Sequence, residues 1–293
     1  MDFKNYDLYF PHLNIGIEHM RNSITVFGYR IAFYGIIIGF GMLMGFLVAT
    51  RDYKRRGFDP DVITDFGLYT VILAVLGARI YYVIFEWEYY SKHLNEIINI
   101  RQGGLAIYGG VIMSVICCVV FTKRRKISFY NIADSGIIGM ILGQAIGRWG
   151  NFFNMEAFGG YTDSLFAMRL KESAVNPNMM NDDVLSHMIN VGGVDYIQVH
   201  PTFLYESCWN FCVFLVLYFV IARKKKFEGQ VFYSYLLLYG IGRFFIEGLR
   251  TDSLYLWGTG IAVSQALSAV LAVGSAAVIA FRLSRQKASA AQA

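Results

Sequence analysis

The stretch YRIAFYGIIIGFGMLMGFLVAT, residues 29–50, decides the class of this protein. Arg30 is its only charged residue, and the other side chains are almost all apolar. A helix needs about twenty mostly apolar residues to cross a hydrocarbon core about 30 Å thick. The stretch therefore predicts a transmembrane helix over 29–49.

The composition of the whole chain also favours a membrane protein. Of its 293 residues, 56% are hydrophobic and 16% are charged, with a mean hydropathy of +0.43. The net charge of +5 does not indicate a nucleic-acid partner, because the basic residues stand in short blocks between apolar runs. The first twenty residues lack an apolar core and a cleavage site, so no removable signal peptide is predicted.

Six further apolar runs follow the first and give seven predicted transmembrane helices. The six runs are 66–86, 105–121, 132–150, 203–222, 230–248 and 257–281. Basic blocks follow the first, third, fifth and seventh runs, at 51–56, 123–126, 223–226 and 282–287. Because basic loops stay in the cytoplasm, the N-terminus is predicted outside and the C-terminus in the cytoplasm. We expect an all-α polytopic membrane protein of about seven transmembrane helices with a small extracytoplasmic insertion.

The predicted spans divide the chain into five parts. These are an extracytoplasmic N-terminal segment at 1–28, helices one to four within 29–150, an extracytoplasmic subdomain at 151–202, helices five to seven within 203–281, and a cytoplasmic tail at 282–293. The insertion is polar and rich in turn residues, which favours a small folded subdomain, and a flexible connector is the alternative. Four cysteines lie inside apolar runs and are predicted to be packing residues rather than disulfides or metal ligands: Cys117, Cys118, Cys208 and Cys212.

Four arginines fall at a similar depth near the outer ends of four predicted helices. They are Arg30, Arg79, Arg148 and Arg243. Charge within a bilayer is costly and is by default a sign of function, and a guanidinium suits phosphate. One anionic ligand, such as a phospholipid headgroup, would explain all four. For Arg30 and Arg79, simple extension of the side chain to the interface is the alternative.

Two of these helices carry further polar residues. On the sixth, one face is lined at helical spacing by Tyr239, Arg243, Glu247 and Arg250. A purely structural Arg243–Glu247 pair is the alternative to a functional one. The end of the fourth packs four polar residues into nine positions: Arg148, Asn151, Asn154 and Glu156. This density is difficult to explain by helix packing alone.

Five stretches of the sequence form a recognisable set. They are GARIYYVIF at 77–85, GGLAIYGG at 103–110, GRWGNFFNMEAFG at 147–159, HPTFLYES at 200–207 and YGIGRFFIEGLRTD at 239–252. Together they resemble the bacterial prolipoprotein diacylglyceryl transferases, in the order found in that family. The resemblance runs from about Tyr29 to Gly258, and the stretch at 147–159 is its most specific signature.

The resemblance implies a transferase that acts on lipid and protein. Such an enzyme moves the diacylglyceryl group of phosphatidylglycerol onto the lipobox cysteine of a prolipoprotein, forming a thioether and releasing glycerol phosphate. It implies a bacterial cytoplasmic membrane protein whose active site faces the outer leaflet. Its partners would be phosphatidylglycerol, prolipoproteins and membrane lipids. We expect no cofactor, no metal and no nucleic acid, because the sequence shows no metal-ligand cluster and no nucleotide-binding loop.

The same resemblance suggests site residues. Those expected to bind phosphatidylglycerol are Arg148, Asn151, Asn154, Glu156, Tyr34 and Arg243. Arg148 and Arg243 would also stabilise charge on the departing phosphate. Candidates for orienting groups or proton acceptors are Tyr239, Glu247, Tyr108 and His200. Many members have histidine where this chain has Tyr108, so no base is assigned; for His200, a structural anchor is the alternative.

Two other functions are compatible with intramembrane charge. A transporter or channel for an anionic or lipid substrate would line its path with such residues. Against it, the charges stop at the outer level and no internal repeat is evident. A scaffold or lipid-binding module is the second alternative, and it would tolerate loss of the chemistry of Arg148.

Overall fold

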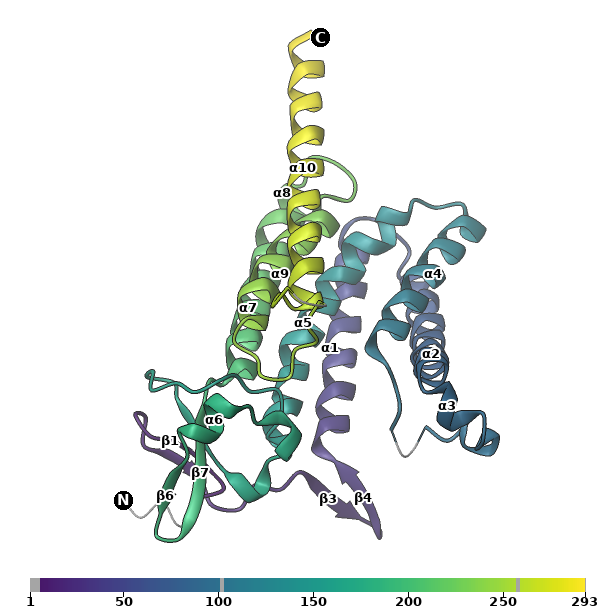
Figure 1. Ribbon diagram of the computed structural model, residues 1–293. Coiled ribbons are helices and arrows are strands. Elements are labelled where there is room, and N and C mark those ends of the chain that lie inside the picture. Colours follow the sequence, from purple (N-terminus) through teal and green to yellow (C-terminus); the bar gives the residue numbers. More distant parts are fainter. Residues whose placement is uncertain (1–5, 101–102, 257–258, 293) are drawn as a thin grey trace. The chain divides into compact units, whose positions relative to one another are not determined.

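The computed structural model describes residues 6–100, 103–256 and 259–292, and most of these are helical (Figure 1). Among the described residues, five helices are long and apolar enough to cross a membrane. They are α1 (Phe33–Arg55), α2 (Pro60–Phe85), α4 (Ile107–Arg125), the continuous helix Thr202–Lys224, and α10 (Val263–Gln292). The continuous helix comprises α7 (Thr202–Leu215), a π-helical stretch (Val216–Ile221) and α8 (Ala222–Lys224). The protein is therefore a polytopic helical membrane protein.

Two more helices occupy the remaining predicted spans. They are α5 (Phe129–Asn154) and α9 (Gln230–Glu247). Neither is among the five helices that are apolar enough by length and composition to cross a membrane, because they contain polar residues such as Gln144, Arg148, Arg243 and Glu247. Short helices and turns lie between the long ones: α3 (Trp87–Tyr90), α6 (Asp182–Ser186), and the 3₁₀ turns Leu94–Glu96, Glu172–Ala174 and Pro177–Met179.

The ends of three helices differ from the sequence prediction. Helix α1 begins at Phe33, so Arg30 belongs to a strand and does not open the helix. Helix α2 begins earlier than expected, at Pro60, because the side chain of Asp59 caps it and proline suits its first position. Helix α10 begins at Val263 and continues to Gln292, through residues that favour helix, where a tail was expected from 282. Residues 257–258 of that predicted span, and residues 1–5, lie outside the described part.

The all-α prediction is wrong for the polar segments, which contain two antiparallel sheets. One is a hairpin of β3 (Ser23–Val26) and β4 (Tyr29–Ala32), turning at Gly28, whose φ is +81°. The other has five strands in the order β2 (Ile15–Ile17), β1 (Leu8–Phe10), β5 (Met168–Lys171), β7 (Val194–Val199) and β6 (Ile189–Val191). Strands this short leave no clear periodicity, and β1 pairs with β5 across about half the chain.

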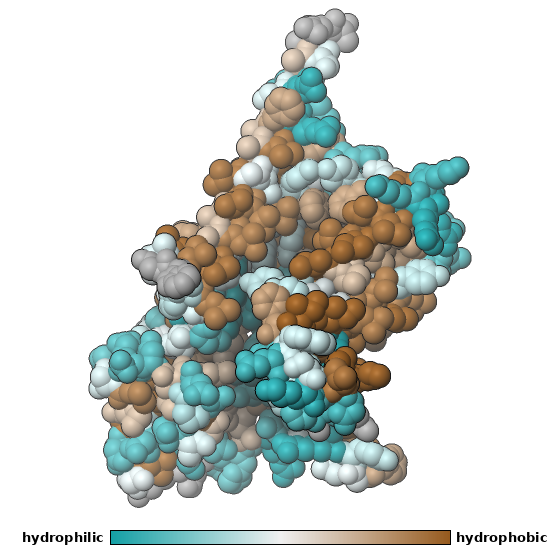
Figure 2. Space-filling view, turned by 45° about the vertical axis from the view of Figure 1, so that its right-hand side comes forward, coloured by the Kyte–Doolittle hydropathy of each residue, from teal (hydrophilic) through white to brown (hydrophobic). Residues whose placement is uncertain are grey.

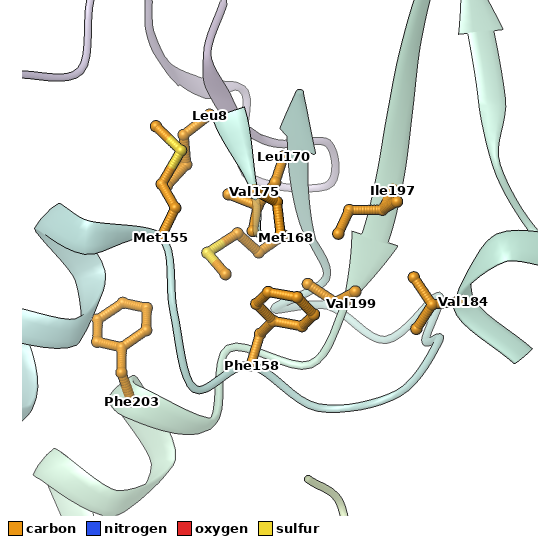
Figure 3. Close-up of a cluster of buried hydrophobic side chains, with 10 residues drawn as sticks. All are labelled: Leu8, Met155, Phe158, Met168, Leu170, Val175, Val184, Ile197, Val199 and Phe203. Atoms are coloured by element: carbon orange, nitrogen blue, oxygen red, sulfur yellow. The ribbon is translucent and has the colours of Figure 1, made fainter. Parts of the chain in front are cut away.

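The five-stranded sheet shares a buried apolar cluster with the adjoining helices (Figure 3). Leu8 of β1, Leu170 of β5 and Ile197 of β7 are fully buried in it, and Phe203 of α7 belongs to the same cluster. The N-terminal segment and the 151–202 insertion therefore fold as one subdomain. This pairing between distant segments was not predicted.

The chain forms two compact units, and each has its own close helix contacts. The first contains Met1–Gly45 and Ile138–Ala293, and the second contains Phe46–Ile137. In the first, Gly143 of α5 faces Gly41 of α1, where an added Cβ would lie 3.2 Å from the Gly41 carbonyl oxygen. In the second, Gly77 of α2 lies against Gly109 of α4. Hydrophobic side chains cover broad areas of the surface in Figure 2, as lipid contact requires.

Candidate functional site

Three helices of the first unit bring together two arginines and two glutamates. Arg148 of α5 pairs through Nη2 with Oε1 of Glu206, on α7. Arg243 of α9 donates from Nη1 to the other Glu206 oxygen, Oε2, at 3.0 Å, and pairs through Nη2 with Glu247 one turn further on. Glu206 therefore joins both arginines with one carboxylate. We call these four residues the Arg–Glu cluster.

The Arg–Glu cluster is buried, but its arginines remain partly accessible. The side chains of Glu206 and Glu247 are 3% and 5% exposed, whereas those of Arg148 and Arg243 are 23% and 16% exposed. Formal charges in the cluster cancel, which lowers the cost of burying them. Among the described residues, Arg148 donates only to Glu206, so its other N–H groups can reach an incoming anion.

Glu206 is the residue that sequence reasoning missed. It lies within the HPTFLYES stretch, beside the predicted His200, but was given no role. On α7 it belongs to a buried polar row with Thr202 and Asn210, spaced four residues apart. A row of polar residues on one face of an apolar helix is a signal that it faces protein rather than lipid. This spacing could have identified Glu206.

The end of α5 holds a second polar group. Glu156 Oε1 accepts hydrogen bonds from the side-chain amides of Asn151, at 3.0 Å, and Asn154, at 3.3 Å. The chain turns sharply here, since Met155 and Ala157 have φ angles of 50° and 57°. Tyr34 of α1 packs at the same level, because its ring lies against Gly150, where an added Cβ would be 2.8 Å from Cδ2. Four predicted lipid-binding residues thus lie near the start of α1 and the end of α5.

Tyr239 lies one turn before Arg243 on α9. Its ring stacks on Tyr235, with centroids 5.3 Å apart, and the Tyr235 hydroxyl donates to Gln144 Oε1 at 3.2 Å. The fully buried side-chain amide of Asn210 has no hydrogen-bond partner among the described residues. Buried polar groups therefore continue along α7 and α9 beyond the Arg–Glu cluster.

His200 lies just before α7 and outside the Arg–Glu cluster. Its backbone pairs with Gly159 and Gly160, and its Nδ1 is 3.4 Å from the Tyr205 hydroxyl oxygen. No hydrogen bond to the cluster is present among the described residues. Burial lowers the pKa of His200, so its ring is neutral at neutral pH.

Arg250 follows α9 rather than continuing its polar face. The helix ends at Glu247, and Arg250 donates two hydrogen bonds to Asp252, at 2.9 and 2.8 Å. Burial raises the pKa of Asp252, but the hydrogen bond and charge of Arg250 outweigh it and hold that pKa below its usual value. Arg250 is therefore not part of the predicted polar face of α9, and it forms a local ion pair with Asp252 instead.

Tyr108 and Arg79 belong to the second unit. Tyr108 lies in the first turn of α4 and is exposed, so its proximity to the Arg–Glu cluster stays a prediction. Arg79 of α2 is buried, and its guanidinium donates to the backbone carbonyls of Glu96, Ile97, Gly103 and Gly104. Arg79 is thus accounted for without any ligand. Arg30 is exposed and donates to the side chains of Asn22 and Ser23.

The described residues contain no group of three or more His, Cys, Asp or Glu side chains arranged to hold a metal ion. All four cysteines have free thiols. The site is therefore built from guanidinium, carboxylate, amide and phenol groups. Such a set can bind an anion and stabilise a leaving phosphate.

Comparisons with known proteins agree with this chemistry. Residues 22–281 match the family model described as prolipoprotein diacylglyceryl transferase. A phosphatidylglycerol–prolipoprotein diacylglyceryl transferase of Finegoldia magna is 44% identical over 253 residues, covering 86% of this chain and 92% of the relative. Proteins of the same name from Bacillus cereus (strain Q1) and Bacillus anthracis are each 44% identical over 251 residues, covering 86% of this chain and 88% of theirs. The chain belongs to the prolipoprotein diacylglyceryl transferase family.

Proposed function

We propose that this protein transfers the diacylglyceryl group of phosphatidylglycerol to the lipobox cysteine of prolipoproteins. The observation that carries this proposal is the Arg–Glu cluster, in which one buried carboxylate holds two arginines from different helices together. The family match over most of the chain gives the reaction class. The cluster supports the proposal that the reaction takes place at Arg148 and Arg243.

The reaction requires stabilisation of a leaving phosphate. The cysteine sulfur forms a bond with the glyceryl carbon that carries the phosphate, while the bond from that carbon to the phosphate oxygen breaks. Glycerol phosphate leaves with the bonding electrons, and a thioether remains. Arg148 and Arg243 would stabilise the charge that gathers on this phosphate, which is worth about 3 kcal/mol per well-placed donor in a site with little water.

The thiol proton needs an acceptor, because a thiol of pKa near 8.5 is mostly protonated at neutral pH. His200 is neutral and half-buried, so one ring nitrogen can accept a proton. Glu247 pairs with Arg243 and is better suited to orienting that arginine. Tyr239 and Tyr108 remain candidates for orienting groups.

Lipid binding would use the residues at the outer ends of α1 and α5. Asn151 and Asn154 already donate to Glu156 through one N–H each. Their remaining N–H groups and carbonyl oxygens can bond the glycerol hydroxyls or phosphate oxygens of the donor. Tyr34 would border the same headgroup from α1.

The proposed topology has seven spans. Helix α5, with 26 residues, is about 39 Å long, which exceeds the thickness of a hydrocarbon core of about 30 Å, and α9, with 18 residues, is about 27 Å long, which is close to it. Their arginines pair with carboxylates, which makes these two helices compatible with the membrane. The N-terminus and the sheet subdomain would then lie outside the bacterial cytoplasmic membrane, and the Arg–Glu cluster would face the outer leaflet.

The test is a transfer assay in detergent with phosphatidylglycerol and a synthetic lipobox peptide. We expect a gain in peptide mass equal to a diacylglyceryl group, together with release of glycerol phosphate. A peptide with serine in place of cysteine should gain nothing. Arg148→Ala should abolish transfer, while Arg285→Ala, which changes an exposed arginine near the end of α10, should not.

Folding of each variant is checked by its elution as a monodisperse species in detergent. Transfer that is independent of the peptide cysteine, or undiminished in folded Arg148→Ala, would contradict the proposed chemistry. No transfer by the folded wild type, under conditions where a relative is active, would contradict the function itself.

A further inference from the structure

An apolar groove runs between α1, α5 and α7 in the first unit. Its volume is about 680 Å³. Side chains that line it include Ile36 and Phe40 of α1, Ile146 and Trp149 of α5, and Cys208 and Phe211 of α7. Phe40 and Phe211 are about half exposed, so the groove is open on the side that meets lipid in the proposed topology. The function proposed above does not yet use it.

The groove is as long as one leaflet is deep. Its lining on α5 extends from Leu142 to Phe153, which are 11 residues apart on one helix. At 1.5 Å per residue this is about 16 Å. Half of a hydrocarbon core about 30 Å thick is about 15 Å. An occupant that lies along the groove would therefore span the apolar part of a single leaflet.

An extended hydrocarbon chain is thin enough to lie along this open, apolar groove. The hydrophobic helix of a protein substrate is the alternative occupant. The experiment below distinguishes the two, because only an acyl chain in the groove makes the product ratio depend on the chain length of the donor.

The polar atoms at the groove are already satisfied. Ser207 Oγ donates to the carbonyl oxygen of Ala145, at 2.8 Å, and accepts from Trp149 Nε1, at 3.2 Å. These groups have no strong need for a further hydrogen bond, so they offer little to a sugar or a peptide backbone. The lining favours a ligand without polar groups.

The outer part of the groove adjoins the Arg–Glu cluster. Trp149 directly follows Arg148 on α5, and Ser207 directly follows Glu206 on α7. On each helix, a residue that lines the groove is thus adjacent in sequence to a residue of the cluster. A lipid whose phosphate lies at Arg148 would therefore have its acyl chains close to the groove.

We propose that this groove binds one acyl chain of the donor phospholipid and that Cys208 and Phe211 limit the length and bulk of that chain. This inference rests on the proposed function and deepens it. Under this inference, two side chains of α7 that take no part in the chemistry help to select the donor lipid.

The test measures which donor the enzyme chooses. Short-chain and long-chain phosphatidylglycerol are supplied in equal amounts with one lipobox peptide, and the two lipidated products are quantified by mass. Cys208→Phe places a ring in the groove and should lower the ratio of long-chain to short-chain product about tenfold. Phe211→Ala widens the groove and should raise the ratio. A ratio of products does not depend on the amount of active enzyme.

Cys212 provides the matched control. It lies one turn after Cys208 on α7 and is likewise exposed, but it is not among the residues that line the groove. Cys212→Phe should leave the product ratio unchanged. If Cys208→Phe does not fold, the product ratio of Phe211→Ala alone tests the inference. An unchanged product ratio in the active variants would overturn the inference, and so would equal shifts from Cys208→Phe and Cys212→Phe. In either case, transfer by the wild type would still support the proposed function.

Discussion

The two units bury arginine in different ways. In the second, Arg79 has neutral partners, since its guanidinium donates to four backbone carbonyl oxygens and lies over the rings of Tyr82 and Tyr90. In the first, Arg148 and Arg243 share the charged partner Glu206. An arginine enclosed by carbonyl groups holds a loop in place. Arginines held together by one carboxylate keep N–H groups for a ligand.

The largest effect is expected from removing the shared charge. Glu206→Gln keeps the shape of the side chain but leaves two half-buried arginines with only Glu247 as counter-charge. Breaking a buried ion pair from one side costs about 3–5 kcal/mol, and transfer activity should be lost as well. The free energy of unfolding in detergent measures the first effect. Glu18→Gln, at an exposed glutamate, is the control and should change neither quantity.

A smaller effect is expected when charge is kept but geometry is lost. Arg243→Lys retains the positive charge, but an ammonium group cannot bond Glu206 and Glu247 with a planar fork. We expect kcat to fall about a hundredfold with a modest change in stability. The measurement is steady-state transfer by the folded variant. Activity close to that of the wild type would mean that charge alone is sufficient at this position.

The comparison is sharpened by the arginine that we interpret as structural. Arg79→Ala leaves four carbonyl oxygens without their donor and should destabilise the protein by about 2 kcal/mol. Activity per folded molecule should be largely kept. Arg30→Ala, in the exposed hairpin, should cost less than about 0.5 kcal/mol. A loss of kcat in folded Arg79→Ala would show that Arg79 also serves the reaction.

The smallest effect concerns pH. Burial lowers the pKa of His200 in the folded protein, so the folded state binds this proton less readily than the unfolded state. Its contribution to stability is present above the unfolded pKa of about 6.5 and is lost as pH falls through the lower, folded value. The melting temperature should therefore decrease slightly more between pH 7 and pH 5.5 in the wild type than in His200→Gln. Equal decreases would contradict this account.

Local patterns in the sequence predicted much of the helical part of the fold. The spacing of Arg243 and Glu247 predicted their contact, and the apolar runs placed the long helices to within a few residues, apart from their capped or extended ends. Both features arise within one helix. The roles of the candidate site residues stay predictions, although the structure brings Arg148, Arg243 and Glu247 into one cluster.

Contacts between distant segments could not be predicted in the same way. The pairing of Leu8 with Leu170 joins strands too short to show a pattern. Likewise, the role of Glu206 appears only when α5, α7 and α9 are packed together. The four-residue spacing of Thr202, Glu206 and Asn210 on α7 indicates that Glu206 faces protein, but it does not indicate which arginines Glu206 contacts. Tertiary packing therefore supplied what periodicity could not.

The bridge through Glu206 also has a consequence for biosynthesis. Arg148 and Glu206 are 58 residues apart. At about 5–20 residues per second, α5 leaves the ribosome about 3–12 s before the carboxylate that balances its arginine. An unpaired arginine costs about 2.5–3.5 kcal/mol at the centre of a membrane helix and less near the end of one, where Arg148 lies in α5. In the proposed seven-span topology, α5 is therefore expected to remain at the insertion machinery longer than a fully apolar helix would, until α7 supplies Glu206.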